Sequence, residues 1–258
     1  MNEVLDLSTL TSVDDIELED ITWGRISEIL QEGAEEKKLQ DILDSKRRIL
    51  FARLSVLEKN PFHNRDHAFA VHNRLSILLK NLKNHNAIPL RNQLLLLEGA
   101  LRHDDGHVGN RYRQDIIDGD TRSNEEYAVD LMFEDFAETP LGEEEKLFLK
   151  RCILATSSWQ KGLPVEDPRY RNYGPETLAE KLLVFADVGA VVIEGWEAWN
   201  GESIGVNKEL WVQSQAEKEK FFTYVVSLYE ELKGHFGDDF CRILEGNIED
   251  VRSKLSNT

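Results

Sequence analysis

Apolar residues recur at the 3.6-residue period of an α-helix along most of this 258-residue chain, which contains only six prolines. No segment shows a convincing strand pattern. The sequence therefore predicts an all-α fold. The pattern is clearest before Asn60-Pro61, where one apolar helix stripe is formed by Leu39, Ile42, Leu43, Ile49, Leu50, Leu54 and Leu57.

Breaks in the apolar pattern divide the chain into a series of expected helices. The first region is expected to hold two helices broken near Gly33, and the polar segment 109–123 is expected to be a long functional loop. No repeat or linker divides the chain, so we expect one domain over residues 1–258, with residues 1–20 as a loose acidic segment. The expected helical ranges are 20–59, 64–84, 90–102, 124–137, 143–158, 175–199, 207–233 and 238–253.

The chain is strongly acidic, with 48 Asp and Glu against 31 Lys and Arg, a net charge of −17 and a pI near 4.9. Binding to a nucleic-acid backbone needs Lys and Arg clustered on one face, so we expect no long nucleic acid as a partner. An acidic enzyme still binds a small anion where divalent cations supply the local positive charge. The acidity is therefore compatible with a metal site.

Other sequence features indicate a reducing, aqueous compartment. Cys152 and Cys241 are the only cysteines, and they form neither a disulfide framework nor a zinc motif. Residues 1–14 contain three acidic and no basic side chains, unlike a secretory signal. No apolar run approaches the roughly 18 residues that span a bilayer. We expect a cytoplasmic protein that does not enter a membrane.

The histidines are concentrated in one part of the chain. Six of the seven lie between residues 63 and 107, and four of them form two tight clusters with neighbouring aspartates. Histidine nitrogen and carboxylate oxygen are common ligands of transition metals and of harder ions. A helix that begins near His63 would place His63 and His67 on one face. His103 and Asp104 follow the expected helix 90–102, and convergence of the two clusters would supply three ligands.

Asp187 is the candidate for a fourth ligand, because it is the single carboxylate in the otherwise apolar segment 182–193. Burial of an unpaired carboxylate costs several kcal/mol, so it must be neutralised, paired or bound to a metal. A buried ion pair and a metal ligand are both open for this residue taken alone. His72, His85 and His235 are expected to be surface or satisfied core residues. Asp66 and Asp105 are expected to be solvated carboxylates in a loop or at a helix start.

The order H…HD…D resembles that of the HD-domain metal-dependent phosphohydrolases, an all-helical superfamily. Within it, the chain resembles the cyclic nucleotide phosphodiesterase catalytic domain. Residues 62–71 (FHNRDHAFAV) resemble the family motif YHNxxHAxDV, and residues 103–110 (HDDGHVGN) resemble HDxxHPGxxN. Shorter segments resemble SxLE (residues 123–126), ILATD (153–157) and, faintly, EFFxQGD (209–215). The resemblance covers about residues 62–217.

The resemblance implies a helical bundle around two divalent cations. A tight first ion, zinc or iron, would be bound by His67, His103, Asp104 and Asp187. Asp104 would bridge to a more hydrated magnesium or manganese ion, with His107, Glu126 and Thr156 around the ligands. A hydroxide between the ions would attack phosphorus, and His63 would protonate the leaving oxygen.

The resemblance also implies a small nucleotide or phosphoester as substrate, with Asn64 and Gln213 in contact with it. Arg111 is the candidate phosphate contact in the polar loop, and Arg65, Arg102 and Arg113 are further ones. Ala70 and Ser157 replace two aspartates of the family pattern, which changes the support of the ligands. No aromatic clamp follows Gln213, so the manner of base recognition is open.

Three alternatives to a cyclic nucleotide phosphodiesterase remain open. A nucleoside monophosphate phosphatase of the same superfamily would release inorganic phosphate. An HD-type di-iron oxygenase usually has two more histidines between the His-Asp pair and the last aspartate, where this chain has only His107. A non-catalytic metal-binding module would not need His63 beside a full set of ligands. The oligomeric state is open.

Overall fold

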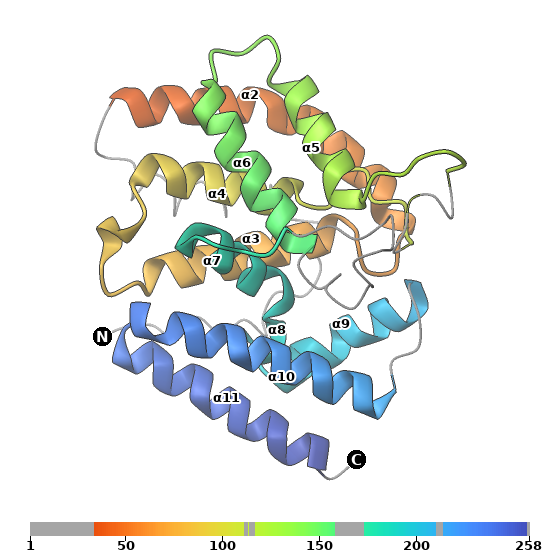
Figure 1. Cartoon of the computed structure of the whole chain (residues 1–258), viewed down its shortest axis with the longest axis vertical. Helices are drawn as coiled ribbons and strands as arrows, with labels where there is room; N and C mark the ends of the chain where they lie inside the picture. The colour runs from red at the N-terminus through yellow and green to blue at the C-terminus, as the bar shows by residue number, and fades with distance from the viewer. Residues whose placement is uncertain (1–33, 111–112, 114–116, 158–172, 210–213, 257–258) are drawn as a thin grey trace, which may run out of the picture. The chain divides into compact units, whose positions relative to one another are not determined.

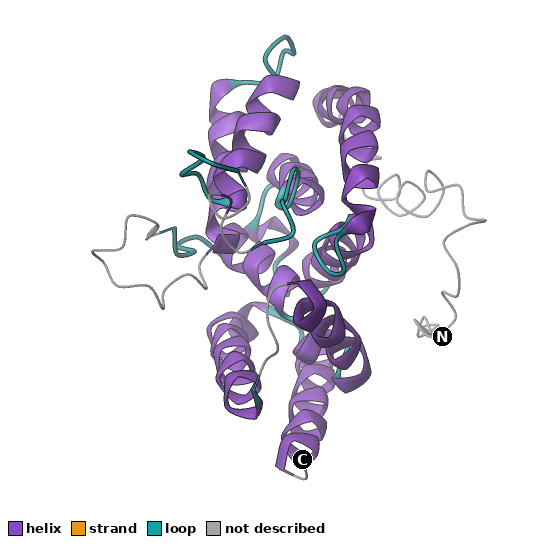
Figure 2. Cartoon of the chain, turned by 90° about the vertical axis from the view of Figure 1, so that its right-hand side faces the viewer, coloured by secondary structure: helices purple, strands orange, loops and turns teal. Residues whose placement is uncertain are grey.

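The computed structural model describes residues 34–110, 113, 117–157, 173–209 and 214–256. Within these ranges every regular element is a helix, as Figure 2 shows, apart from an isolated bridge between Leu82 and Phe236. The prediction of an all-α protein is therefore confirmed for the part of the chain that is described. None of the described helices is both long enough and apolar enough to cross a membrane.

The helices are labelled in Figure 1 in their order along the chain. The α-helices are α2 (Ala34–Val56), α3 (Arg65–Lys80), α4 (Leu90–Arg102), α5 (Asn124–Asp135), α6 (Glu143–Ala155), α7 (Leu178–Val188), α8 (Ala190–Ile193), α9 (Trp196–Glu209), α10 (Gln215–Leu232) and α11 (Asp238–Ser256). The short 3-10 turns are η3 (Leu57–Lys59), η4 (His85–Ala87) and η7 (Lys233–His235).

Two compact units are distinguished along the chain, Met1–Asp41 and Ile42–Thr258. Of the first unit the structure describes residues 34–41, which form the first turns of α2. All of the packing and the site described below belong to the second unit. The expectation of one domain over the whole chain stays a prediction.

The predicted bounds of α4 are confirmed to the residue, whereas the single helix predicted over residues 175–199 is wrong. The chain breaks there into α7, α8 and the start of α9. A side-chain carbon at Gly189 would lie 2.0 Å from the carbonyl oxygen of Phe185, so only glycine fits at the first break. Gly195, at the second break, has a φ of +92°. The helix predicted over 64–84 also ends early, at Lys80.

Within the second unit, α3 packs against α4 and α7, and α6 packs against α4, α5 and α7. The helices α10 and α11 both pack against α8. The helix α7 also packs against α4 and α10. Asp187 near the end of α7 and His67 at the start of α3 are thus brought into one region.

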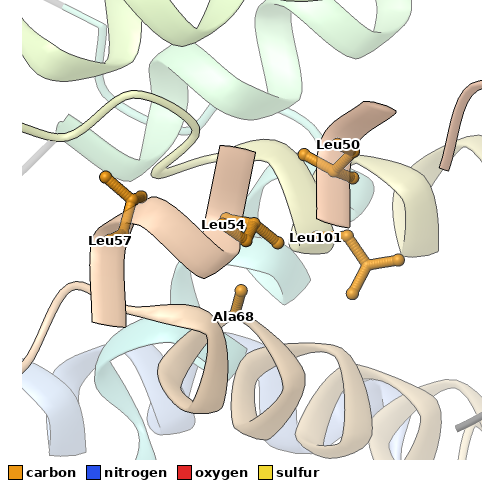
Figure 3. Packing of buried hydrophobic residues seen from close by; sticks show 5 residues of the cluster. All are labelled: Leu50, Leu54, Leu57, Ala68 and Leu101. Carbon is orange, nitrogen blue, oxygen red and sulfur yellow. The ribbon is translucent and has the colours of Figure 1, made fainter. Parts of the chain in front are cut away.

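One apolar cluster lies beside the two histidine segments (Figure 3). Leu50 and Leu54 of α2 meet Ala68 of α3 and Leu101 of α4 there, together with Leu57. Ala68 directly follows one of the predicted ligands and Leu101 lies two residues before another. Closely packed side chains leave little room for movement. The cluster therefore fixes the distance between α3 and the end of α4.

Candidate active site

The four predicted metal ligands converge on one point in the structure. His67 Nε2 lies 3.2 Å from Asp187 Oδ1 and 3.4 Å from Asp104 Oδ2. His103 Nε2 lies 3.0 Å from Asp104 Oδ2 and 3.4 Å from Asp187 Oδ1. His67, His103 and Asp104 are buried, and Asp187 is partly so. Residues from three separate helical segments thus present four donor atoms to one another.

The spacing of these atoms fits the ligand shell of one cation. Nitrogen and oxygen ligands bind zinc at about 2.0 to 2.2 Å, so neighbouring ligand atoms lie about 3.3 to 3.6 Å apart in a tetrahedral shell and about 2.8 to 3.1 Å apart in an octahedral one. Among the described residues, His103 Nε2 and Asp104 Oδ2 are buried and have no hydrogen-bond partner. Buried polar atoms without partners are unfavourable, and a cation between them would satisfy both.

The backbone around the ligands orients their rings. His103 Nδ1 lies 2.8 Å from the carbonyl oxygen of Ala100, so Nδ1–H donates there and the Nε2 lone pair faces the other ligands. Asn64 is the N-cap of α3, and its Oδ1 accepts the backbone N–H of His67 at 3.1 Å. The cap starts the helix so that His67 lies in its first turn.

The expectation that His63 and His67 share a helix face is wrong. The helix α3 begins at Arg65, and Asn64 has extended backbone, so His63 precedes the helix. Asn64 stops the helix at this point because its side chain occupies the N-cap position. His63 is directed instead towards the end of α9, at a carboxylate distant in sequence.

Glu209 holds His63 with both of its oxygens. Oε1 lies 2.6 Å from His63 Nδ1, and Oε2 accepts the backbone N–H groups of Phe62 at 2.7 Å and of His63 at 2.9 Å. The Glu209 side chain is 1% exposed. A buried carboxylate with this contact keeps the proton on Nδ1, which leaves Nε2 of His63 as the nitrogen able to exchange a proton with a bound molecule.

His107 stacks on His63, with ring centroids 3.8 Å apart and ring planes within 16° of parallel. A metal lies in the plane of each imidazole that binds it, so two stacked parallel rings cannot direct their lone pairs at one ion. His107 Nδ1 also accepts the backbone N–H of Gly109 at 3.0 Å. The ligand atoms of His63, His107 and Glu209 lie close enough together to bind one metal ion. The stacked rings and the hydrogen bond to Glu209 instead favour a role in proton transfer.

The pKa values of His103 and His63 are raised, and that of His107 is lowered. Burial by itself lowers the pKa of His103, but the charges of Asp104 and Asp187 outweigh burial and raise it well above its ordinary value. Burial alone would likewise lower the pKa of His63, which Asp104 and Glu209 raise. The pKa of His107 lies well below its usual range because of burial and the nearby charge of His63.

The pKa values of the two proposed aspartate ligands are lowered, whereas that of His103 is raised. Burial by itself raises the pKa of a carboxyl group, but the nearby charge of His103 holds the pKa values of Asp104 and Asp187 below their usual range. The anionic form of both ligands is therefore favoured, which is the form that a cation binds.

Glu126, predicted to support the second ion, takes part in a helix cap. Its Oε2 accepts the backbone N–H of Ser123 at 2.8 Å, and its own N–H is bonded to Ser123 Oγ at 3.0 Å. These two bonds form the capping box of α5. Its Oε1 accepts the hydroxyl of Tyr173 at 2.8 Å. The prediction that Glu126 supports a cation stays a prediction.

The adjacent Glu125 has the environment expected of a ligand. Its Oε2 is buried and has no hydrogen-bond partner in the described part of the chain. Burial raises its pKa and the charge of Asp104 acts in the same direction, whereas hydrogen bonds to its own backbone and to Ser123, together with the charge of His63, oppose the change. The sequence did not indicate Glu125, although the Ser-x-x-Glu capping pattern assigns Glu126 to the helix cap and leaves Glu125 for another role.

The remaining residues predicted to support the ligands or contact the substrate either form hydrogen bonds to the nearby backbone or lie outside the described residues. Thr156 is buried, and its Oγ1 donates to the carbonyl oxygen of Ile153 at 2.7 Å. Asn64 Nδ2 donates to the carbonyl oxygen of Asn60 at 3.0 Å, in addition to its capping bond. Arg111 and Gln213 lie outside the described residues. Substrate contact by these residues stays a prediction.

The expectation that Asp105 is a solvated carboxylate is wrong. Asp105 is fully buried, and Arg53 of α2 donates from Nε to its two oxygens at 3.0 Å each. Arg53 also binds Asp135 of α5. The paired cation explains the burial, because a buried carboxylate is tolerated when an arginine fork satisfies it. The sequence predicts no such partner because Arg53 lies 52 residues away.

Two of the arginines considered for phosphate contact are buried and form ion pairs with carboxylates of the protein. Arg102 is fully buried, with Nε 2.6 Å from Glu98 and Nη1 2.7 Å from Asp135. Arg113 lies 3.0 Å from Asp120 and stacks over the ring of Tyr127. These contacts stabilise the segments around the site.

No protein-family model matches the chain, and no match to a curated protein was found.

Proposed function

We propose that this protein is a metal-dependent phosphoester hydrolase that acts on a small nucleotide, with a 3′,5′-cyclic nucleotide as the favoured substrate. The observation that carries the proposal is the convergence of His67, His103, Asp104 and Asp187 beside the separate His63–Glu209 pair. The first group has the spacing of a ligand shell, and the second has the geometry of a proton donor. The resemblance to the HD-domain phosphohydrolases supports the same assignment.

In this proposal the ligands bind a first cation, zinc or iron, and Asp104 contributes to a second site for magnesium or manganese. Such a pair of cations, when bound, supplies an activated water and stabilises charge on phosphoryl oxygens. Glu125 is our candidate for an additional ligand of the second cation, because of its buried oxygen without a partner among the described residues.

His63 acts in this proposal as the general acid. Glu209 retains the Nδ1 proton and fixes the ring, so Nε2 is the position from which a proton passes to the leaving oxygen of the substrate. His107, stacked on one face of the ring, restricts rotation of His63. The role of His63 rests on this geometry, in which both Glu209 oxygens are engaged by residues 62 and 63.

The proposal is tested by elemental analysis of the purified protein together with hydrolysis of bis-p-nitrophenyl phosphate and cyclic AMP in the presence of manganese. We expect about two metal equivalents and cleavage of the diester. His63→Asn should retain the metal and lose about 10²- to 10⁴-fold in turnover. His85→Asn, at an exposed histidine in η4, is the matched control and should retain full activity.

Absence of metal from the wild-type protein, or full activity of His63→Asn, would overturn the proposal. Release of inorganic phosphate from a nucleoside monophosphate without cleavage of the cyclic ester would replace the phosphodiesterase with the phosphatase. Two bound irons without hydrolysis would favour the di-iron oxygenase.

A further inference from the structure

Arg74 is a fully buried arginine on α3, two helical turns after His67. It therefore lies on the same face of α3 as His67, the face that packs against α7. Its Nη1 donates to the carbonyl oxygens of Ala186 and Asp187, each at 2.9 Å. The guanidinium thus binds the backbone of the residue that supplies a proposed ligand.

These carbonyl groups belong to the last turn of α7. The helix ends at Val188 and the chain turns at Gly189, so these groups are among those that lack an intrahelical partner. A cation at a helix C-terminus is also favoured by the helix dipole. Arg74 satisfies both carbonyl oxygens with one side chain, and it thereby holds the backbone of Asp187 at a defined distance from α3.

The other side of the guanidinium contacts two carboxylates. Nη2 is paired with Glu202 of α9, and Nε lies 3.4 Å from Glu194 at the end of α8. A buried arginine requires such partners, because desolvation of an unpaired charge costs several kcal/mol. The helix α9 ends at Glu209, the residue that holds His63. Arg74 therefore joins the segments that carry a proposed ligand and the partner of the proposed acid.

We infer that Arg74 is a positioning residue for the first cation: it fixes the end of α7 so that the Asp187 carboxylate lies among His67, His103 and Asp104. This inference rests on the proposed function. Groups that orient metal ligands typically change metal affinity by about 10- to 100-fold when they are removed. The planar guanidinium bonds two carbonyl oxygens and the carboxylate of Glu202 at once and lies near that of Glu194, which the single ammonium group of lysine cannot do.

The test compares wild-type protein with Arg74→Lys and Arg74→Gln, using cobalt and zinc as the probes. Metal affinity is measured by competition with a chelator, and the geometry of bound cobalt is followed by its visible absorption spectrum. We expect about 10- to 100-fold weaker binding and an altered cobalt spectrum in both variants. Arg47→Lys is the control, because Arg47 is also a buried arginine but is paired with Glu98 and Asp44.

The outcomes separate this inference from the proposed function. Failure of the wild-type protein to bind either metal would overturn both. Wild-type affinity and spectrum in Arg74→Lys would overturn the inference alone, as would an equal loss in Arg47→Lys, since the effect would then follow general destabilisation. If Arg74→Gln does not fold, as judged by circular dichroism, the charge-retaining lysine variant decides the question.

Discussion

At the scale of the residue, two adjacent glutamates have different environments. Glu126 is bonded to Ser123 and Tyr173, whereas Glu125 has a buried oxygen without a partner among the described residues. A buried carboxylate oxygen without a hydrogen-bond partner is unfavourable unless a cation lies beside it. The difference arises because position N3 of a helix reaches back to the N-cap, while position N2 projects elsewhere.

We predict that Glu125→Gln weakens activation by manganese or magnesium, with a half-saturating concentration about 10-fold higher or more. Loss of one anionic oxygen lowers the affinity of the second cation site. Glu126→Gln is the charge-matched control, because glutamine also completes a capping box. A titration of activity with manganese measures both variants. If only Glu126→Gln weakened activation by manganese, Glu126 and not Glu125 would be the residue that supports the second cation.

At the scale of the element, α2 holds the loop that follows α4. Arg53 binds Asp105 and Asp135, and Asp105 directly follows the proposed ligand Asp104. The apolar cluster around Leu54 and Leu101 lies at the same junction (Figure 3). Ionic and apolar contacts thus stabilise one loop geometry together. Burial raises the pKa of Asp105 even though Arg53 opposes that change.

We predict that Arg53→Met lowers the free energy of unfolding by about 3 kcal/mol at neutral pH, because it leaves the buried carboxylate of Asp105 without its cation and Asp135 with Arg102 alone. The loss should shrink as the pH falls, since protonation of Asp105 then removes its unpaired charge. Urea unfolding of the apo protein between neutral and acid pH measures this. Arg53→Met with Asp105→Asn should be less destabilised than Arg53→Met alone. An equal loss at every pH would contradict the explanation.

At the scale of the whole molecule, packing determines how stability responds to pH. His72 on α3 is buried, and burial lowers its pKa to about 4, with the charge of Arg47 acting in the same direction and that of Glu98 opposing it. In the unfolded chain the same group would bind a proton near pH 6.5. The unfolded state therefore binds more protons between these two pH values, and stability falls as the pH is lowered through that interval.

We predict that this histidine contributes a loss of up to about 3 kcal/mol in the free energy of unfolding as the pH falls from neutral towards about 4. His72→Phe retains a ring but has no proton to bind, so its stability should decline less steeply than that of the wild type. Denaturant unfolding across the interval measures both proteins. Parallel stability curves would show that His72 does not titrate as a buried group.

Local sequence patterns determine the helices and the candidate ligands. The bounds of α4 follow from apolar periodicity alone, and the residue types of His67, His103, Asp104 and Asp187 by themselves indicate a metal site. Helix periodicity depends on residues near one another in the chain, and ligand chemistry depends on the residue type. Both can therefore be predicted from the sequence. The break at Gly189 does not follow from the sequence, because a glycine inside an apolar pattern is compatible with a continuous helix.

The tertiary structure alone decided which side chains meet. Glu209 joins His63 over 146 residues, and Arg53 joins Asp105 over 52. Arg74 reaches the end of α7 only because α3 and α7 pack together. The sequence determined the helical character of the described residues and the residue types that could bind a metal, whereas helix packing selected their partners. The physical reason is that buried charges are paired by proximity in space, and periodicity along the chain carries no information about distant partners.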